Sequence, residues 1–132
     1  MSRYQWNYGR SRNKYRNRKV EADGVVFDSV KEARRWRELT LLQSAGEISD
    51  LERQVKFELI PAQHEPDRTG KRGGTIKGKL LERKVEYIAD FVYTDVKTGQ
   101  RIVEDTKGVK TKDYIIKRKL MLYVHNIRVK EV

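Results

Sequence analysis

The sequence has no cysteine, two prolines, two histidines and no long apolar run. The absence of cysteine excludes disulfides, a thiolate nucleophile and zinc–thiolate sites. No apolar stretch approaches the roughly 18 residues that a membrane-spanning helix needs, and the arginine-rich beginning of the chain does not resemble a secretory signal. His64 and His125 form no ligand-like pair, so we expect surface or packing roles for them. These absences predict a cytoplasmic protein.

What the sequence has in excess is positive charge. Its 132 residues include 30 Lys and Arg against 19 Asp and Glu, which is a formal net charge of +11. A surplus of this size on a chain long enough for one domain with a modest core indicates a polyanionic partner. Nucleic acid is the first candidate, and an anionic membrane surface is a distant second.

Residues 1–19 form a basic N-terminal arm that holds no acidic residue. Tyr4, Trp6, Tyr8 and Tyr15 are interleaved with its Arg and Lys residues. One interpretation is a solvated tail. The other, which the aromatic residues favour, is an arm that places arginines on phosphates and rings on bases or on a partner subunit. The candidate DNA contacts in the arm are Arg10, Arg12, Lys14, Arg16 and Arg18.

The rest of the chain, residues 20–132, predicts a single α/β domain. Hydrophobic periodicity, helix-capping residues and turn residues place its elements. We expect a hairpin over 20–27, a helix from Ser29 to Gly46, strands over 51–60, 84–94 and 101–107, a helix over 111–125, and a strand over 127–132. This order predicts a central mixed β-sheet flanked by helices.

Residues 62–79 contain Pro66, four glycines and five basic residues. This composition predicts a mobile loop or the tip of a long hairpin. It is either a plain flexible insert or a basic loop that contacts a DNA backbone. In the second case Lys71 and Arg72 are candidate DNA contacts.

The strand predicted over 101–107 ends in Glu104-Asp105-Thr106-Lys107. Because successive side chains of a strand point to opposite faces, Asp105 and Lys107 share a face. A carboxylate that binds a divalent metal, beside a lysine that orients water or stabilises charge on a phosphate, suits phosphodiester hydrolysis. Asp-x-Lys alone is a weak signal, since it arises by chance in a charged protein.

Asp90 strengthens this signal because it interrupts an apolar strand, residues 88–92. A buried carboxylate needs a partner or a metal. If the two neighbouring strands form a hairpin, Asp90 approaches Asp105 across the ladder. Two carboxylates with a backbone carbonyl and waters suit the oxygen shell of Mg²⁺. The alternative is a structural ion pair of Asp90 with Lys107 or an arginine.

Glu32 is a third candidate carboxylate. At about 100° per residue it lies on the same arc of the first helix as Trp36 and Leu39. It also stands three residues after Ser29, as in a capping box, where its side chain would bond back to the Ser29 N–H. Both interpretations, cap and site, remain open.

Lys119 is a fourth candidate, on the apolar arc of the second helix. That arc consists of Ile115, Ile116, Leu120, Leu122 and Tyr123. Lys119 either extends along the apolar surface to solvent or reaches the acidic cluster or the phosphate. Further basic candidates for DNA contact in this region are Lys110, Lys112 and Lys117.

A helix glutamate, then Asp, then Asp-x-Lys in an α-β-β-β-α-β order resembles the PD-(D/E)XK nuclease superfamily. The likeness is closer to its small phage-encoded members, which are similar to archaeal-type Holliday junction resolvases. It covers about residues 20–132 and leaves the N-terminal arm out. The matching segments are residues 25–35, 45–51, 87–91, 104–108 and 117–120.

The resemblance implies a restriction-endonuclease-like core, a homodimer, and hydrolysis of branched DNA with Mg²⁺, for which Mn²⁺ substitutes. It implies that Glu32, Asp90 and Asp105 bind the metal with help from the Thr106 carbonyl. It implies Lys107 as the catalytic lysine. The chain departs from the pattern at Ala89, where the superfamily often has proline, a residue commonly replaced there.

A basic nucleic-acid-binding protein without chemistry, such as a recombination accessory factor, is the second hypothesis. Composition alone favours it. The spacing of the carboxylates and Lys107 favours the enzyme, because binding alone needs no carboxylates directed at a phosphate. A nuclease for flaps, ends or ordinary duplex remains open beside the junction resolvase.

Overall fold

A tight hairpin begins the described part of the chain, which is residues 19–132 of the computed structural model. Strand β1 (Val20–Ala22) pairs antiparallel with β2 (Val25–Phe27). Asp23 and Gly24 between them both have positive φ, as a two-residue hairpin turn requires. The predicted hairpin is confirmed. The predicted N-terminal arm, except Lys19, lies outside the described residues.

Helix α1 (Val30–Ser44) begins and ends where the sequence predicts. The Ser29 side chain caps it by accepting a hydrogen bond of 3.1 Å from the Glu32 N–H. At the other end Gly46 has a φ of 77°, the left-handed conformation that ends many helices. Glu32 and Leu39 are buried on the helix face that the periodicity predicts.

The central sheet has four strands in the order β10-β9-β8-β3. Strand β8 runs antiparallel to both β3 and β9, whereas β10 runs parallel to β9. The sheet is therefore mixed, as predicted. Its strands are β3 (Ile48–Ile60), β8 (Val85–Asp95), β9 (Arg101–Asp105) and β10 (Lys130–Glu131).

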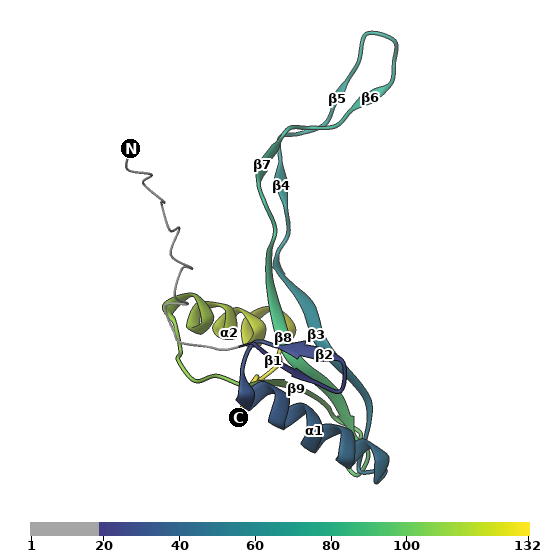
Figure 1. The fold of residues 1–132 in the computed structure, drawn as a ribbon. Helices are drawn as coiled ribbons and strands as arrows, with labels where there is room; N and C mark the ends of the chain where they lie inside the picture. The colour runs from purple at the N-terminus through teal and green to yellow at the C-terminus, as the bar shows by residue number, and fades with distance from the viewer. Residues whose placement is uncertain (1–18) are drawn as a thin grey trace, which may run out of the picture.

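The two helices cover opposite faces of this sheet (Figure 1). Helix α2 (Lys112–His125) packs Tyr114 and Met121 into one core cluster, and α1 packs Ala33 and Leu39 into the other. The sheet therefore lies between two separate apolar layers. The face of the sheet to which a side chain points determines which of the two helices it contacts.

Beyond the core, β3 and β8 continue into a protruding β-ribbon, residues 61–84 (Figure 1). Two short pairs of strands build it: β4 (Gln63–His64) with β7 (Leu80–Glu82), and β5 (Arg68–Thr69) with β6 (Thr75–Ile76). Of the two interpretations of residues 62–79, the structure therefore shows the long hairpin. Almost every residue of the ribbon is exposed, so it has no core of its own.

Strand β9 ends at Asp105, two residues earlier than predicted. The backbone N–H of Thr106 donates to the Asp90 carboxylate at 2.9 Å and not to a carbonyl of a neighbouring strand. Regular strand pairing therefore stops at Asp105. The prediction used side-chain alternation, which carries no information about this bond.

Helix α2 has the predicted bounds but a different buried face. Tyr114 and Met121 are buried, whereas Ile116 is 56% and Tyr123 is 88% exposed. The face of α2 that contacts the sheet is narrower than the apolar arc predicted from the sequence, and it is rotated about the helix axis from that arc. As a result Lys119 is exposed, which corrects the prediction that it lies on a core-facing arc.

The remaining features concern the C-terminal strand and the length of the helices. Strand β10 is shorter than the predicted strand over 127–132. Among residues 19–132 no helix is both long and apolar enough to cross a membrane.

Candidate active site

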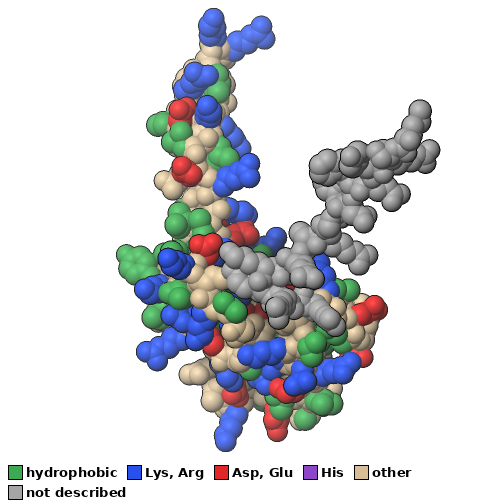
Figure 2. Space-filling view, turned by 60° about the vertical axis from the view of Figure 1, so that its left-hand side comes forward, with side chains coloured by type: hydrophobic (Ala, Val, Ile, Leu, Met, Phe, Trp, Pro, Cys, Tyr) green, Lys and Arg blue, Asp and Glu red, His purple; other side chains and the backbone are tan. Residues whose placement is uncertain are grey.

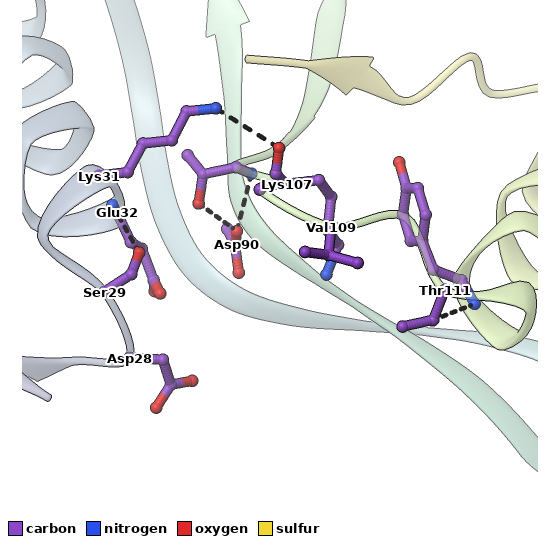
Figure 3. Close-up of a pocket in the computed structure, with 11 residues that line it drawn as sticks. Asp28, Ser29, Lys31, Glu32, Asp90, Lys107, Val109 and Thr111 are labelled. Carbon is purple, nitrogen blue, oxygen red and sulfur yellow. Dashed lines mark hydrogen bonds between the residues drawn. The ribbon is translucent and has the colours of Figure 1, made fainter. Parts of the chain in front are cut away.

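A cavity of about 360 Å³ lies beside the N-terminus of α1, Asp90 of β8 and the loop that joins β9 to α2. Figure 3 shows Glu32 from α1, Asp90 from β8 and Lys107 from this loop around it. Four of the residues predicted to form a site therefore line one cavity. They are Glu32, Asp90, Thr106 and Lys107.

Glu32 reaches the cavity from the first turn of α1 and is only 3% exposed. Its backbone N–H is bonded to Ser29, and its Oε1 lies 3.3 Å from Nε2 of Gln54. The Ser29 side chain therefore caps the helix, but the Glu32 carboxylate lies among the site residues and not in the predicted bond to the Ser29 N–H.

Gln54 and Asp90 stand at a matched irregularity in β3 and β8. Ala89 packs in the α2-side core and Phe91 in the α1-side core, although residues two apart in a regular strand share a face. Gln54 lies opposite, between register pairs Arg53–Phe91 and Val55–Ala89, and has a φ of 55°, rare for this residue type. The interruption of both strands places two polar side chains beside Glu32.

Asp90 is bound on both of its oxygens. Its Oδ2 accepts hydrogen bonds from the N–H and the hydroxyl of Thr106 at 2.9 and 2.8 Å, and its Oδ1 lies 3.5 Å from Nε2 of Gln54. Among the described residues Asp90 forms no salt bridge, so the alternative of a structural ion pair with Lys107 or an arginine is not what the structure contains.

Asp105 is fully buried and does not itself line the cavity. Its Oδ2 accepts a hydrogen bond of 2.5 Å from the Tyr87 hydroxyl and lies 3.5 Å from Nζ of Lys107. Its Oδ1 is buried without a hydrogen-bond partner. An unpartnered buried carboxylate oxygen is costly, so Asp105 has an unused binding capacity beside Asp90.

Two lysines supply positive charge at the cavity. Lys107 lies in the loop after β9, and its Nζ lies 3.5 Å from Oδ2 of Asp105 and 4.9 Å from the ring centre of Tyr114. Lys31 extends from α1 so that its Nζ lies 3.5 Å from the carbonyl oxygen of Lys107 (Figure 3). Thr111 caps the nearby N-terminus of α2, where the helix dipole also favours an anion.

Burial and the negative charge of Asp90 favour the protonated forms of Glu32 and Asp105. Burial, followed by the negative charges of Asp90 and Asp28, raises the pKa of Glu32 to about 7. Burial and then the adjacent Asp90 raise the pKa of Asp105 well above its usual range, although Tyr87 and Lys107 act in the opposite direction. Such a cluster gains stability from any bound cation.

The donor chemistry of this cluster fits a hard divalent cation, because it offers carboxylate oxygens and one of them is unpartnered. Within residues 19–132, however, no three Asp, Glu or His groups are already gathered as a metal-binding set. Glu32, Asp90 and Asp105 are the residues that would hold the ion.

Glu104, the acid next to Asp105, belongs to the fold. It is fully buried on the α1 side of the sheet, where Arg35 binds both of its oxygens and the Tyr93 hydroxyl donates to it at 2.6 Å. The side chains of Glu104 and Asp105 thus lie in different surroundings, and Asp105 is the one that lies beside Lys107.

The other predicted residues lie away from the cavity or outside the described chain. Lys119 is exposed on α2 and does not line the cavity. Lys71 and Arg72 lie at the end of the β-ribbon, and Lys110 forms a salt bridge with Glu131. Lys112 and Lys117 lie on α2. Arg10, Arg12, Lys14, Arg16 and Arg18 are outside the described residues.

Sequence reasoning missed Gln54 and Lys31. Gln54 falls at a position where strand alternation predicts a solvent-facing side chain, so the pattern carried no signal for it. The sequence did carry a signal for Lys31, since this residue precedes Glu32 in the first turn of a helix whose N-terminus faces the candidate site.

Comparison with known proteins identifies one family. The family model described as protein of unknown function, DUF1064, matches residues 12–131, so the chain belongs to this family. No curated protein and no solved structure matches the chain.

Proposed function

We propose that this DUF1064 protein is a Mg²⁺-dependent DNA endonuclease with a restriction-endonuclease-like core of the PD-(D/E)XK type. One observation carries the proposal. Glu32, Asp90 and Lys107, which come from three segments far apart in the sequence, line a single cavity, with Asp105 buried beside them. A protein that only binds nucleic acid has no need to bury two carboxylates, Glu32 and Asp105, whose pKa values are raised by burial and by Asp90.

Different groups of the chain have different roles in the proposed phosphodiester hydrolysis. Lys107 is positioned by Asp105 and Tyr114 to orient the attacking water or to stabilise the charge that develops on the phosphate. Lys31 and the N-terminus of α2 are placed to hold the phosphate. Thr106 fixes Asp90 through two hydrogen bonds.

Mg²⁺ bound by Glu32, Asp90 and Asp105 would lower the pKa of a coordinated water and neutralise charge on the phosphate. The three carboxylates would hold the ion, and the raised pKa values of Glu32 and Asp105 would make its binding dependent on pH.

The substrate that we propose is branched DNA, foremost four-way junctions cut by a homodimer. The net charge of +11 supports a DNA substrate. The resemblance of the motifs to junction resolvases supports the branched form, and two sites in a dimer match paired nicks on two strands.

The test is incubation of labelled junction, flap, linear duplex and single-stranded DNA with the full chain, in Mg²⁺ or EDTA. Asp105→Asn removes the charge at the site. Glu52→Gln is the matched control, since Glu52 is exposed on β3 away from the cavity. Paired nicks near the junction centre that are lost only in Asp105→Asn support the proposal. Tight binding without cleavage under any divalent metal would overturn it in favour of a binding protein.

A further inference from the structure

The β-ribbon carries a concentration of positive charge that the cavity does not use. Its outer part, residues 68–79, here called the ribbon tip, contains five basic residues and no acidic one. They are Arg68, Lys71, Arg72, Lys77 and Lys79. The acidic residues of the ribbon lie nearer the core, at Glu65, Asp67 and Glu82. Figure 2 shows the Lys and Arg side chains spread over the protruding ribbon and its end.

The ribbon is held in a defined shape although it packs on no other described element. The Gly78 N–H donates to Oδ1 of Asp67 at 2.8 Å, and the Glu65 N–H donates to the Lys79 carbonyl at 2.8 Å. At Gly78 the two strands cross so closely that a Cβ atom would lie 1.6 Å from the carbonyl oxygen of Glu65. Gly78 therefore permits a close crossing that joins the inner and outer strand pairs.

The five basic side chains of the ribbon tip form no salt bridge among the described residues. A two-stranded ribbon is marginally stable by itself, and this one buries almost no side chain against the domain, so a binding role accounts for it better than a contribution to the core. Apolar association with a second copy is poorly served, because Leu80 and Leu81 are adjacent in a strand and point to opposite faces. Positive charge distinguishes the ribbon tip, which has five basic residues and no acidic one.

We propose that the ribbon tip is a second DNA-binding site, which holds a duplex limb of the substrate at a distance from the cavity. The major groove of B-DNA admits a two-stranded ribbon, and lysines and arginines on it meet phosphates without reading sequence. This inference rests on the proposed function for the identity of the substrate, while the binding that it describes does not depend on cleavage.

The length of the ribbon limits where this second contact falls. A strand advances about 3.3 Å per residue, so the chain from Gln54 in the site to Lys71 in the tip spans at most about 55 Å. At about 3.4 Å per base pair, that is about 16 base pairs. The ribbon tip therefore contacts a limb at up to about this distance from the branch, so that long limbs reach it and very short limbs do not.

The experiment measures binding of fluorescent junctions whose limbs run from about 6 to about 24 base pairs, by anisotropy over a range of salt concentrations. All proteins are full chains that carry Asp105→Asn, so that cleavage does not interfere. Lys71→Ala/Arg72→Ala neutralises the tip. Lys97→Ala/Arg37→Ala removes the same charge from exposed positions on the core. Gly78→Ala keeps the charge and disturbs the crossing.

The tip variant is expected to bind long limbs about tenfold more weakly and to lower the salt slope by about 1.8, which corresponds to two phosphate contacts. Its binding to the shortest limbs is expected to match that of the parent. Gly78→Ala is expected to show the same length-dependent loss, and the core variant less than a twofold change.

Equal binding of the tip and core variants at every limb length would overturn the inference. A change of oligomeric state in the tip variant, measured by light scattering, would also overturn it by assigning the ribbon to a second copy of the chain. If cleavage by the wild-type chain is absent but the length-dependent loss is present, the proposed function fails and the second DNA-binding site stands.

Discussion

Asp90 and Thr106 are joined by two hydrogen bonds to one carboxylate oxygen, one from the Thr106 backbone at 2.9 Å and one from its hydroxyl at 2.8 Å. This pair ends strand β9 and fixes the residue before Lys107. We expect Thr106→Val, which removes only the hydroxyl bond, to lower kcat about tenfold, the effect of about 1.4 kcal/mol in the transition state. Thr106→Ser is expected to retain activity. Equal activities of the two variants would show that the hydroxyl does not position Asp90.

Neutralising Glu32 is expected to stabilise the metal-free protein above neutral pH. Its folded-state pKa of about 7 lies above the unfolded value of 4.5, so the folded state binds more protons and becomes less stable as the pH rises between these values. Above pH 7 the full penalty is present. Glu32→Gln should then raise the unfolding free energy by on the order of 2 kcal/mol while it abolishes cleavage. Urea unfolding in EDTA at pH 5 and pH 8 checks this, and a loss of stability at pH 8 contradicts it.

Divalent metal is expected to stabilise the wild-type chain more strongly at pH 8 than at pH 6. Protons compete with the ion for Glu32 and Asp105, whose pKa values are raised by burial and by Asp90. Thermal unfolding with Mg²⁺ or Ca²⁺ measures the shift in Tm. In Glu32→Gln the shift should shrink or vanish. A shift that is independent of pH and of Glu32 would place the ion elsewhere.

Lys107→Ala is expected to reduce kcat by about 100- to 1000-fold, the usual effect of removing a group that stabilises transition-state charge. Binding of uncleaved DNA should change little, because Lys107 is one of many basic residues. Lys97→Ala, an exposed lysine in the turn after β8, is the matched control. Single-turnover cleavage and anisotropy separate the two effects. A parallel loss of affinity and rate would make Lys107 a binding residue.

Arg35→Ala is expected to destabilise the fold by about 3–5 kcal/mol, since it leaves the fully buried Glu104 without its cation. Adding Glu104→Gln should restore part of the loss. Glu38→Gln removes only the exposed partner of Arg35 and should cost less than about 1 kcal/mol. Chemical denaturation gives all three values. A mild effect of Arg35→Ala would mean that Tyr93 alone satisfies Glu104.

The order of elements and most of the site could be predicted from the sequence because they depend on local rules. Ser29 and Gly46 mark the ends of α1, and the Asp-x-Lys spacing predicted that Asp105 and Lys107 lie side by side, as their separation of 3.5 Å confirms. These features need only the pattern of neighbouring residues. The same rules placed Glu32 on the buried side of its helix.

The remaining features depend on contacts between distant segments. The switch of faces at Gln54 and Asp90 requires both strands to be interrupted at matched positions, which neither segment shows alone. Lys119 was misplaced because the sheet covers a narrower part of α2 than its apolar arc. The ribbon was left open between loop and hairpin because its glycines and charges give no alternation.

The ribbon's lack of a core has a consequence for how this protein tolerates change. Because residues 61–84 bury almost nothing, insertions, deletions or charge reversals there leave the two apolar layers of the domain intact. The length and charge of the ribbon can therefore change without altering the cavity between α1, β8 and the loop after β9. Within residues 19–132 the ribbon is also the segment that a protease is expected to cut first, and the nicked domain is expected to remain folded.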